Sequence, residues 1–170
     1  MANISYDAFT VFEKDGNYER KIIEKKVNDL PEDYLLIKVS YSSLNYKDVL
    51  SAIGNKGVTK EYPHTPGIDA AGIVEESKNE AFNKGDNVIV TGYDLGMNTD
   101  GGFAEYIMVP AKWAVPLPNN LSLKESMIYG TAGFTAALSI FKLINSGVKK
   151  DKSNILVTGA SGGVGSLACS

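Results

Sequence analysis

The chain has 170 residues, of which 44% are hydrophobic and 22% charged, and only one is a cysteine, Cys169. This composition is typical of ordinary globular proteins, and one thiol excludes a disulfide framework or a four-cysteine zinc site. The net charge of −3 and the scattered basic residues argue against nucleic acid as a partner. No apolar run approaches the ~20 residues that cross a bilayer, and the first residues have neither pattern expected of a secretory or transit peptide. We expect a cytoplasmic protein that binds neither nucleic acid nor membrane.

Short apolar or β-branched runs fill the first 120 residues. Turn-forming sequences such as Asp15-Gly16 and Lys84-Gly85-Asp86 separate them. The runs lie at 9–12, 34–41, 72–75, 87–90 and 104–109. This spacing predicts a small, mostly antiparallel barrel or sandwich over residues 1–120.

A different pattern follows Pro118. Ser122 and Glu125 have the spacing of a capping box, and apolar residues at helical spacing predict a long helix over 131–145. The continuous apolar run at 154–158 then predicts a buried parallel strand. We therefore expect a second, α/β domain to begin within residues 121–170.

A glycine-rich turn follows that predicted strand directly. It fits the dinucleotide fingerprint, with Ala160 in the place of the first glycine. Small residues there permit a tight turn, let backbone amides approach a diphosphate, and let the next helix pack closely. The residues expected to bind the cofactor are Ala160, Ser161, Gly162, Gly163, Val164 and Gly165.

The same turn has two other interpretations. Residues 159–163 match the G-x-S-x-G elbow of hydrolases, but that elbow needs a later histidine, and the only histidine, His64, precedes it. The second interpretation, a glycine-rich turn that connects strand and helix and binds no ligand, is not excluded by the sequence. If the fingerprint holds, a dinucleotide domain needs about five or six parallel strands, so we expect the chain ending at Ser170 to be an N-terminal fragment.

Two segments of the first domain carry polar residues of interest. Asn45 could cap a short helix and Tyr46 could pack in the core; alternatively, Tyr46 and Asp48 reach a cleft as proton donors or positioning groups. Asp69 begins an otherwise apolar strand, so its carboxylate must be paired, hydrogen-bonded or functional. His64 has no cysteine nearby, which argues against a metal site.

Six sequence blocks, taken together, resemble the medium-chain dehydrogenase/reductase superfamily. Within it, they are most similar to the zinc-independent quinone-oxidoreductase branch and its acryloyl-CoA reductase group. The blocks are SSLNYKD (42–48), YPHTPGIDAAG (62–72), GGFAEY (101–106), AKWAVPLP (111–118), YGTAGFTAAL (129–138) and VTGASGGVG (157–165). The zinc ligands and the four-cysteine lobe of zinc members are absent from the sequence, so a zinc alcohol dehydrogenase is excluded.

The resemblance implies a mostly β GroES-like barrel followed by the start of an α/β Rossmann domain, with the active site between them. It implies NADPH as the cofactor and a homodimer when the protein is full length. Asn45, Tyr46 and Asp48 would lie beside the nicotinamide and substrate, and Asp69 would line the same site. Thr131 would be a cofactor neighbour at the N-terminus of the linking helix, where an unpaired amide and a hydroxyl could meet phosphate or nicotinamide.

The reaction implied by this resemblance is NADPH-dependent reduction of the activated C=C bond of an α,β-unsaturated acyl thioester or carbonyl compound. Hydride goes to the β-carbon and a proton to the α-carbon, and Tyr46 is the first candidate for the proton donor, Asp48 the second. A quinone is the alternative substrate. A truncated barrel without activity of its own is the remaining alternative, and no metal is expected.

Overall fold

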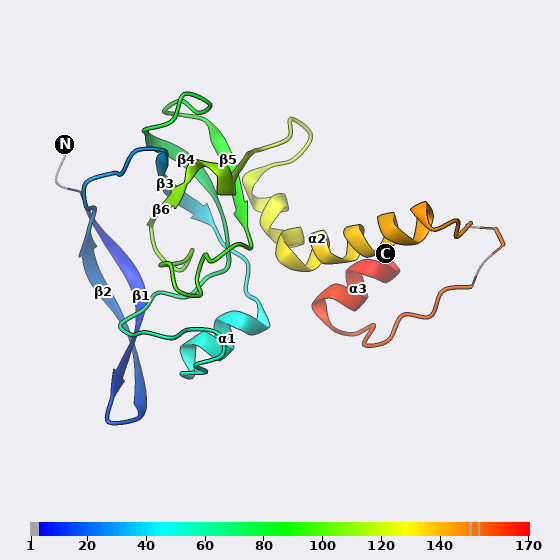
Figure 1. The fold of residues 1–170 in the computed structure, drawn as a ribbon, viewed down its shortest axis with the longest axis horizontal. Coiled ribbons are helices and arrows are strands. Elements are labelled where there is room, and N and C mark those ends of the chain that lie inside the picture. Colours follow the sequence, from blue (N-terminus) through cyan, green and yellow to red (C-terminus); the bar gives the residue numbers. More distant parts are fainter. Residues whose placement is uncertain (1–3, 150, 153) are drawn as a thin grey trace.

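The computed structural model describes residues 4–149, 151–152 and 154–170. All of the described strands precede one long helix, Leu123–Asn145, and a seven-residue helix, Gly163–Cys169, follows it (Figure 1). The elements are β1 (Ser5–Lys14), β2 (Asn17–Lys26), β3 (Tyr34–Tyr41), α1 (Tyr46–Ala52), β4 (Asp69–Ser77), β5 (Asn87–Thr91), β6 (Tyr106–Pro110), η1 (Ala111–Trp113), β7 (Ala114–Pro116), α2 (Leu123–Asn145) and α3 (Gly163–Cys169).

The strands form two antiparallel sheets. β1 and β2 make a long hairpin, and the other five strands form a sheet in the order β6-β3-β4-β5-β7. Isolated bridges from Ala8 to Ala104 and from Val11 to His64 join the hairpin to the loops beside the larger sheet. The prediction of a mostly antiparallel β domain is confirmed.

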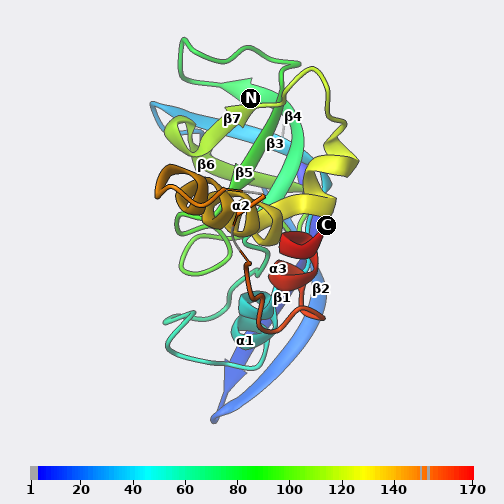
Figure 2. The ribbon, with the colours of Figure 1, turned by 90° about the vertical axis from the view of Figure 1, so that its right-hand side faces the viewer.

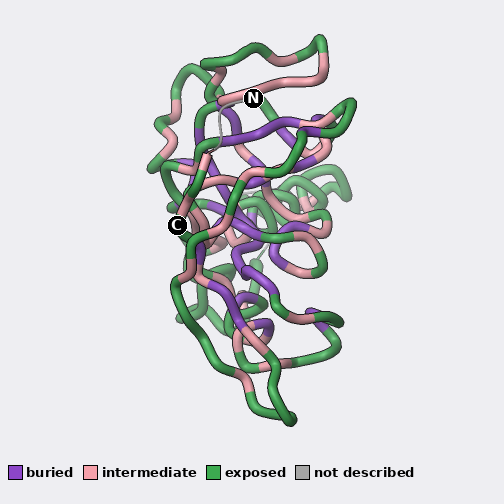
Figure 3. The backbone as a smooth tube through the Cα atoms, turned by 90° about the vertical axis from the view of Figure 1, so that its left-hand side faces the viewer, coloured by how far each residue is buried: buried purple, intermediate pink, exposed green. Residues whose placement is uncertain are grey.

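The hydrophobic core lies within the five-stranded sheet. Alternate residues of neighbouring strands supply it, including Leu35 and Ile37 of β3, Val74 of β4 and Val109 of β6, all at most 1% exposed. Figure 3 shows these buried segments in purple. Every predicted strand in this part is present, and the range predicted for β3 agrees with the structure at both ends.

The sequence did not reveal β2, although it spans ten residues. Its side chains are mostly charged, and even Ile22 is 72% exposed, so the apolar alternation of a half-buried strand is missing. β2 forms because its backbone pairs along the whole of β1. Lysine and glutamate on such a free edge discourage pairing with other chains.

Helix α2 begins where the capping box predicted. The backbone N–H of Ser122 donates to the Glu125 carboxylate at 2.8 Å, and the Glu125 N–H donates to the Ser122 hydroxyl at 3.2 Å. By length and composition alone, α2 is apolar enough to cross a membrane. The prediction that no segment of the chain could cross a bilayer, made from the lengths of its apolar runs, therefore excluded too much. One such helix is weak evidence, and α2 is broken at Gly130 and packs against β4 and α3.

The predicted strand at 154–158 is wrong. Residues 154–157 have no regular structure and 158 lies in a turn, and Ile155 and Leu156 are 57% and 87% exposed. A parallel strand forms only beside a neighbour, and no other described strand pairs with this segment. The helix expected after the glycine turn is present as α3, which lies beside α2 (Figure 2).

Candidate active site

The carboxylate of Asp69 lies at the centre of the candidate site. It is fully buried at the start of β4. The side-chain amide of Asn45 and the backbone N–H of Thr131 donate to its Oδ2 at 2.8 and 2.9 Å, and the Thr131 hydroxyl donates to its Oδ1 at 2.6 Å. The expectation that this carboxylate has partners is confirmed. Asp69 thereby joins β4 to both α1 and α2.

A break in α2 makes room for this carboxylate. Gly130 has φ 49° and ψ −153°, a conformation open to glycine, and a Cβ there would lie 2.8 Å from Oδ2 of Asp69. A regular helix would pair the Thr131 N–H with the Met127 carbonyl. Here the N–H binds Asp69, and the carbonyl accepts from the Ser43 hydroxyl at 2.6 Å. Side chains from the sheet region thus satisfy both groups.

The amide of Thr131 was expected to be unpaired, and that expectation is wrong. Both its N–H and its hydroxyl donate to Asp69. The break at Gly130 divides α2 into two helical segments, and Thr131 is the first residue of the second segment. Its amide therefore has no proton left for a phosphate.

Asn45 and Tyr46 mark the start of α1. Asn45 is the N-cap of this helix, as the more conservative interpretation predicted, while its side-chain amide group binds Asp69. Tyr46 is the first helical residue and is 78% exposed. Core packing of Tyr46, one of the two interpretations, is therefore excluded, and its hydroxyl is accessible.

Asp48 is buried, with backbone amides around its carboxylate. Oδ1 accepts from the N–H groups of Gly67 and Ile68 at 3.1 and 2.9 Å, and Oδ2 accepts from the N–H of Asn45 at 2.7 Å. Burial raises the pKa of Asp48 above its ordinary value; the three amides oppose this and the charge of Asp69 adds to it. Asp48 fastens the first turn of α1 to the segment before β4.

A cavity of about 440 Å³ lies beside Thr131. Tyr93 and Trp113 form one wall, with their rings stacked 5.4 Å apart, and Phe134 and Thr135 of α2 contribute to another. None of its lining residues is charged. Such a cavity suits an uncharged, flat group.

The glycine turn reaches the same part of α2. Residues 160–164 are exposed, and Gly165 is buried against the Gly159 carbonyl, which a Cβ at Gly165 would strike. A Cβ at Gly163 would lie 3.5 Å from that of Ala132, the residue after Thr131. Of the predicted site residues, the structure brings Asn45, Asp69 and Thr131 into hydrogen-bonded contact and the glycine turn against α2.

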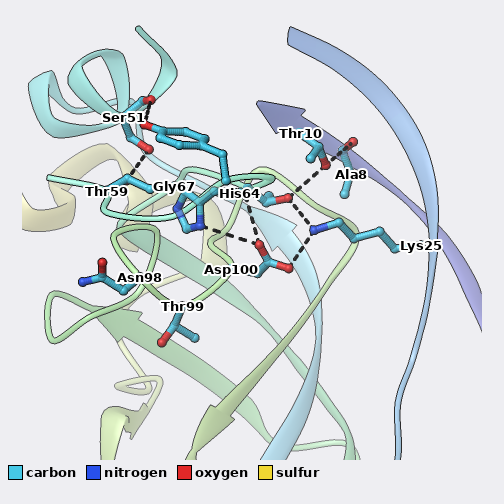
Figure 4. Close-up of polar contacts among 12 residues, drawn as sticks. Ala8, Thr10, Lys25, Ser51, Thr59, His64, Gly67, Asn98, Thr99 and Asp100 are labelled. Atoms are coloured by element: carbon cyan, nitrogen blue, oxygen red, sulfur yellow. Dashed lines mark hydrogen bonds and ion pairs between the residues drawn. The ribbon is translucent and has the colours of Figure 1, made fainter. Parts of the chain in front are cut away.

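His64 belongs to a separate polar cluster, shown in Figure 4. Its Nδ1 lies 3.8 Å from the Asp100 carboxylate, which also accepts from Lys25 at 2.7 Å and from the Thr65 N–H at 3.0 Å. Burial lowers the pKa of His64, and among the described residues its Nε2 finds no hydrogen-bond partner. In the described part of the chain, no three His, Cys, Asp or Glu side chains are placed to hold a metal.

Residues that the sequence did not single out also build the site. Ser43 and Gly130 stand inside the family-like blocks, but nothing in their spacing indicates a helix break. Tyr93 and Trp113 are twenty residues apart in the sequence, and only the pairing of β5 with β7 brings their surroundings together. Tyr93 has a positive φ angle, and no local sequence pattern predicts this backbone conformation for an aromatic residue.

Comparison with known proteins identifies the fold family. The profile of the alcohol dehydrogenase GroES-like domain matches residues 31–119. YhfP of Bacillus subtilis, provisionally named as a quinone oxidoreductase, is 56% identical over 142 residues, which are 84% of this chain and 43% of YhfP. Acrylyl-CoA reductase AcuI of Ruegeria pomeroyi is 42% identical over 156 residues, 92% of this chain and 47% of AcuI.

Solved structures agree with these relationships. The crystal structure of YhfP with NAD bound superposes with a TM-score of 0.92 at 48% identity, covering 97% of this chain and 50% of YhfP. The yhdH oxidoreductase from Salmonella enterica in complex with NADP gives 0.91 at 40% identity, covering 95% and 50%. The chain thus spans about half the length of the relatives it matches. It belongs to the alcohol dehydrogenase GroES-like domain family, within the medium-chain dehydrogenase/reductase superfamily.

Proposed function

We propose that this chain supplies the catalytic site of a zinc-independent, NADPH-dependent oxidoreductase that reduces the activated C=C bond of an α,β-unsaturated acyl thioester or carbonyl compound. The observation that carries the proposal is the hydrogen-bonded set of Asn45, Asp69 and Thr131, with the accessible hydroxyl of Tyr46 next to Asn45. Similarity to AcuI supports this substrate class, and the NADP in the yhdH structure supports the cofactor.

The residues present fit a dinucleotide. The first amides of α3, those of Gly163, Val164 and Gly165, have no acceptor within the helix, and the turn before them is exposed. We assign the diphosphate to residues 160–165 and the nicotinamide to the surroundings of Thr131. Tyr46 would contact both cofactor and substrate.

When bound, NADPH would supply the hydride that adds to the β-carbon of the substrate. The chain's own residues would then complete the reduction. The Tyr46 hydroxyl donates its proton to the α-carbon and regains one from water, because it is exposed. Asn45 and Asp69 hold the start of α1 in place, and we assign Asp48 a positioning role, since backbone amides bind both of its oxygens.

Turnover measurements with two acceptors test this function. We expect faster NADPH consumption with acrylyl-CoA than with a simple benzoquinone. Tyr46→Phe should lower turnover about a hundredfold and leave cofactor affinity nearly unchanged, whereas the control Tyr41→Phe should change neither turnover nor cofactor affinity. Unchanged turnover in Tyr46→Phe would remove this residue from the mechanism.

Quinone reduction is the second candidate. The uncharged, aromatic cavity beside Thr131 favours it, and so does the name of YhfP. A strong preference for the benzoquinone would establish this alternative. A chain that shows no saturable binding of NADPH would instead be a barrel without a cofactor site.

A further inference from the structure

A second cavity, of about 430 Å³, lies at the edge of the five-stranded sheet that β6 forms. The start of β1, the end of β2 and the strand β6 contribute most of its lining, and we call it the β6 cavity. The cavity beside Thr131 lies at the opposite edge, next to β5 and β7, and the two share no lining residue. The volume of the β6 cavity is within the range that holds small molecules.

One wall of the β6 cavity is apolar. Leu36 and Ile107 are 1% and 3% exposed, and Met108 is the register partner of Leu36 in the β3–β6 pair. The rings of Tyr6 and Tyr106 meet edge to face, with their centroids 5.8 Å apart. Such a wall suits the apolar body of a small molecule.

Lys25 brings a largely buried ammonium group to this cavity. Its side chain is 21% exposed. Its Nζ donates to the Thr65 hydroxyl at 2.9 Å and to the Asp100 carboxylate at 2.7 Å (Figure 4). An ammonium group has three protons to donate, and the third has no acceptor among the described residues. Because Lys25 lines the cavity, a ligand there can accept this third hydrogen bond.

Three more side chains of the lining have donors to offer. The hydroxyls of Tyr6 and Tyr106 and the ammonium group of Lys26 make no hydrogen bond with another described residue. Burial, and then the charge of Asp100, raises the pKa of Tyr6, so its hydroxyl keeps its proton. The described lining holds two lysines and one carboxylate, which Lys25 already pairs. One positive charge is therefore left for a ligand.

We propose that the β6 cavity is a binding site for a small monocarboxylate with an apolar body, separate from the site of reduction. The carboxylate accepts from Lys25, Lys26 and the tyrosine hydroxyls, and the apolar body packs on Leu36. A phosphate monoester is a poorer ligand, because its second negative charge would lie near Asp100. This inference goes beyond the proposed function and does not rest on it.

Phenylacetate and phenylacetamide test the charge of the ligand, since they share the same apolar body. We expect NMR titration of the isotope-labelled chain to show saturable shifts at amides around the cavity, such as those of Lys26 and Met108. Phenylacetate should bind about tenfold more tightly than phenylacetamide, because a hydrogen bond to a charged acceptor is stronger than one to a neutral acceptor.

Two substitutions in the cavity have a matched control. Lys26→Gln, at an exposed position, should weaken phenylacetate about threefold and leave phenylacetamide unchanged. Tyr6→Phe keeps the ring and should weaken phenylacetate about fivefold. Lys14→Gln removes the same charge as Lys26→Gln at the tip of the hairpin, outside the cavity, and should leave both affinities unchanged.

Several results would overturn the proposal. Equal affinities for the acid and the amide, or no saturable shift around the cavity, would show that no carboxylate site exists there. Equal losses in Lys26→Gln and Lys14→Gln would mean that overall charge attracts the ligand. Tighter binding of phenyl phosphate than of phenylacetate would contradict selection of a single charge. Each of these results leaves the proposed function standing, because Asn45, Asp69 and Thr131 do not line this cavity.

Discussion

The five-stranded sheet buries most of its apolar side chains, whereas the part of the chain that follows it exposes many of its own. Leu35 of β3 is 0% exposed, but Leu156 is 87% exposed and Phe141 of α2 is 61% exposed. Leucine occupies both a buried and an exposed position, so the hydrophobic character of a side chain alone does not decide whether it is buried. A side chain is buried only where another layer covers it, and in the described chain most of α2 and the segment after it have no such cover.

Hydrogen exchange should separate the two regions most strongly. Amides of β3 pair with strands on both sides, so they exchange only through extensive unfolding. Amides of residues 155–157 pair with no described strand. We expect their exchange rates, followed by mass spectrometry, to differ by a factor of about a thousand or more. Similar rates would mean that the sheet is not the stable part of the molecule.

One substitution made in both regions sharpens the comparison. Leu35→Ala removes side-chain volume from the packed core and should lower the free energy of unfolding by about 3 kcal/mol. Leu156→Ala changes an exposed position and should alter it by less than about 0.5 kcal/mol. Urea titrations of the two variants measure both values. A large effect at Leu156 would show that this segment is buried in solution.

Two glycines allow a similar test of the helices. Gly130→Ala forces a Cβ into a positive-φ position and toward Asp69, and we expect a loss of about 1 to 3 kcal/mol. Gly163→Ala meets only an ordinary contact in α3 and should be neutral or stabilising by up to about 1 kcal/mol. Thermal unfolding compares them. Equal losses would contradict the special role of the break.

The single histidine makes the stability of the sheet region depend on pH. Burial lowers the pKa of His64 below its ordinary value of 6.5, so the unfolded chain takes up a proton before the folded chain does. Stability should therefore fall as the pH drops below 6.5, by at most about 1.4 kcal/mol per pH unit. His64→Gln should lack this component, and urea titrations between pH 7 and 5 measure the difference. Parallel curves for the two proteins would disprove it.

The sequence was informative wherever a local pattern reflects the fold. Apolar runs located five strands, and the Ser122–Glu125 spacing located the start of α2. The need to satisfy a buried carboxylate singled out Asp69, but not its partners, because Asn45 and Thr131 are 24 and 62 residues away. The failure at 154–158 has the same origin, since a strand depends on neighbours that local sequence does not describe.

The break in α2, whose free backbone groups pair with Asp69 and Ser43, has a consequence for how related sequences can diverge. Three positions satisfy or permit the break together: the hydroxyl of Ser43, the carboxylate of Asp69 and the missing Cβ of Gly130. Each contributes to stability only while the other two are present. Their energetic effects should therefore be strongly non-additive. The three positions should therefore change together during evolution. Exchanging one of them with the residue of a distant relative should destabilise the fold, whereas exchanging all three together should preserve its stability.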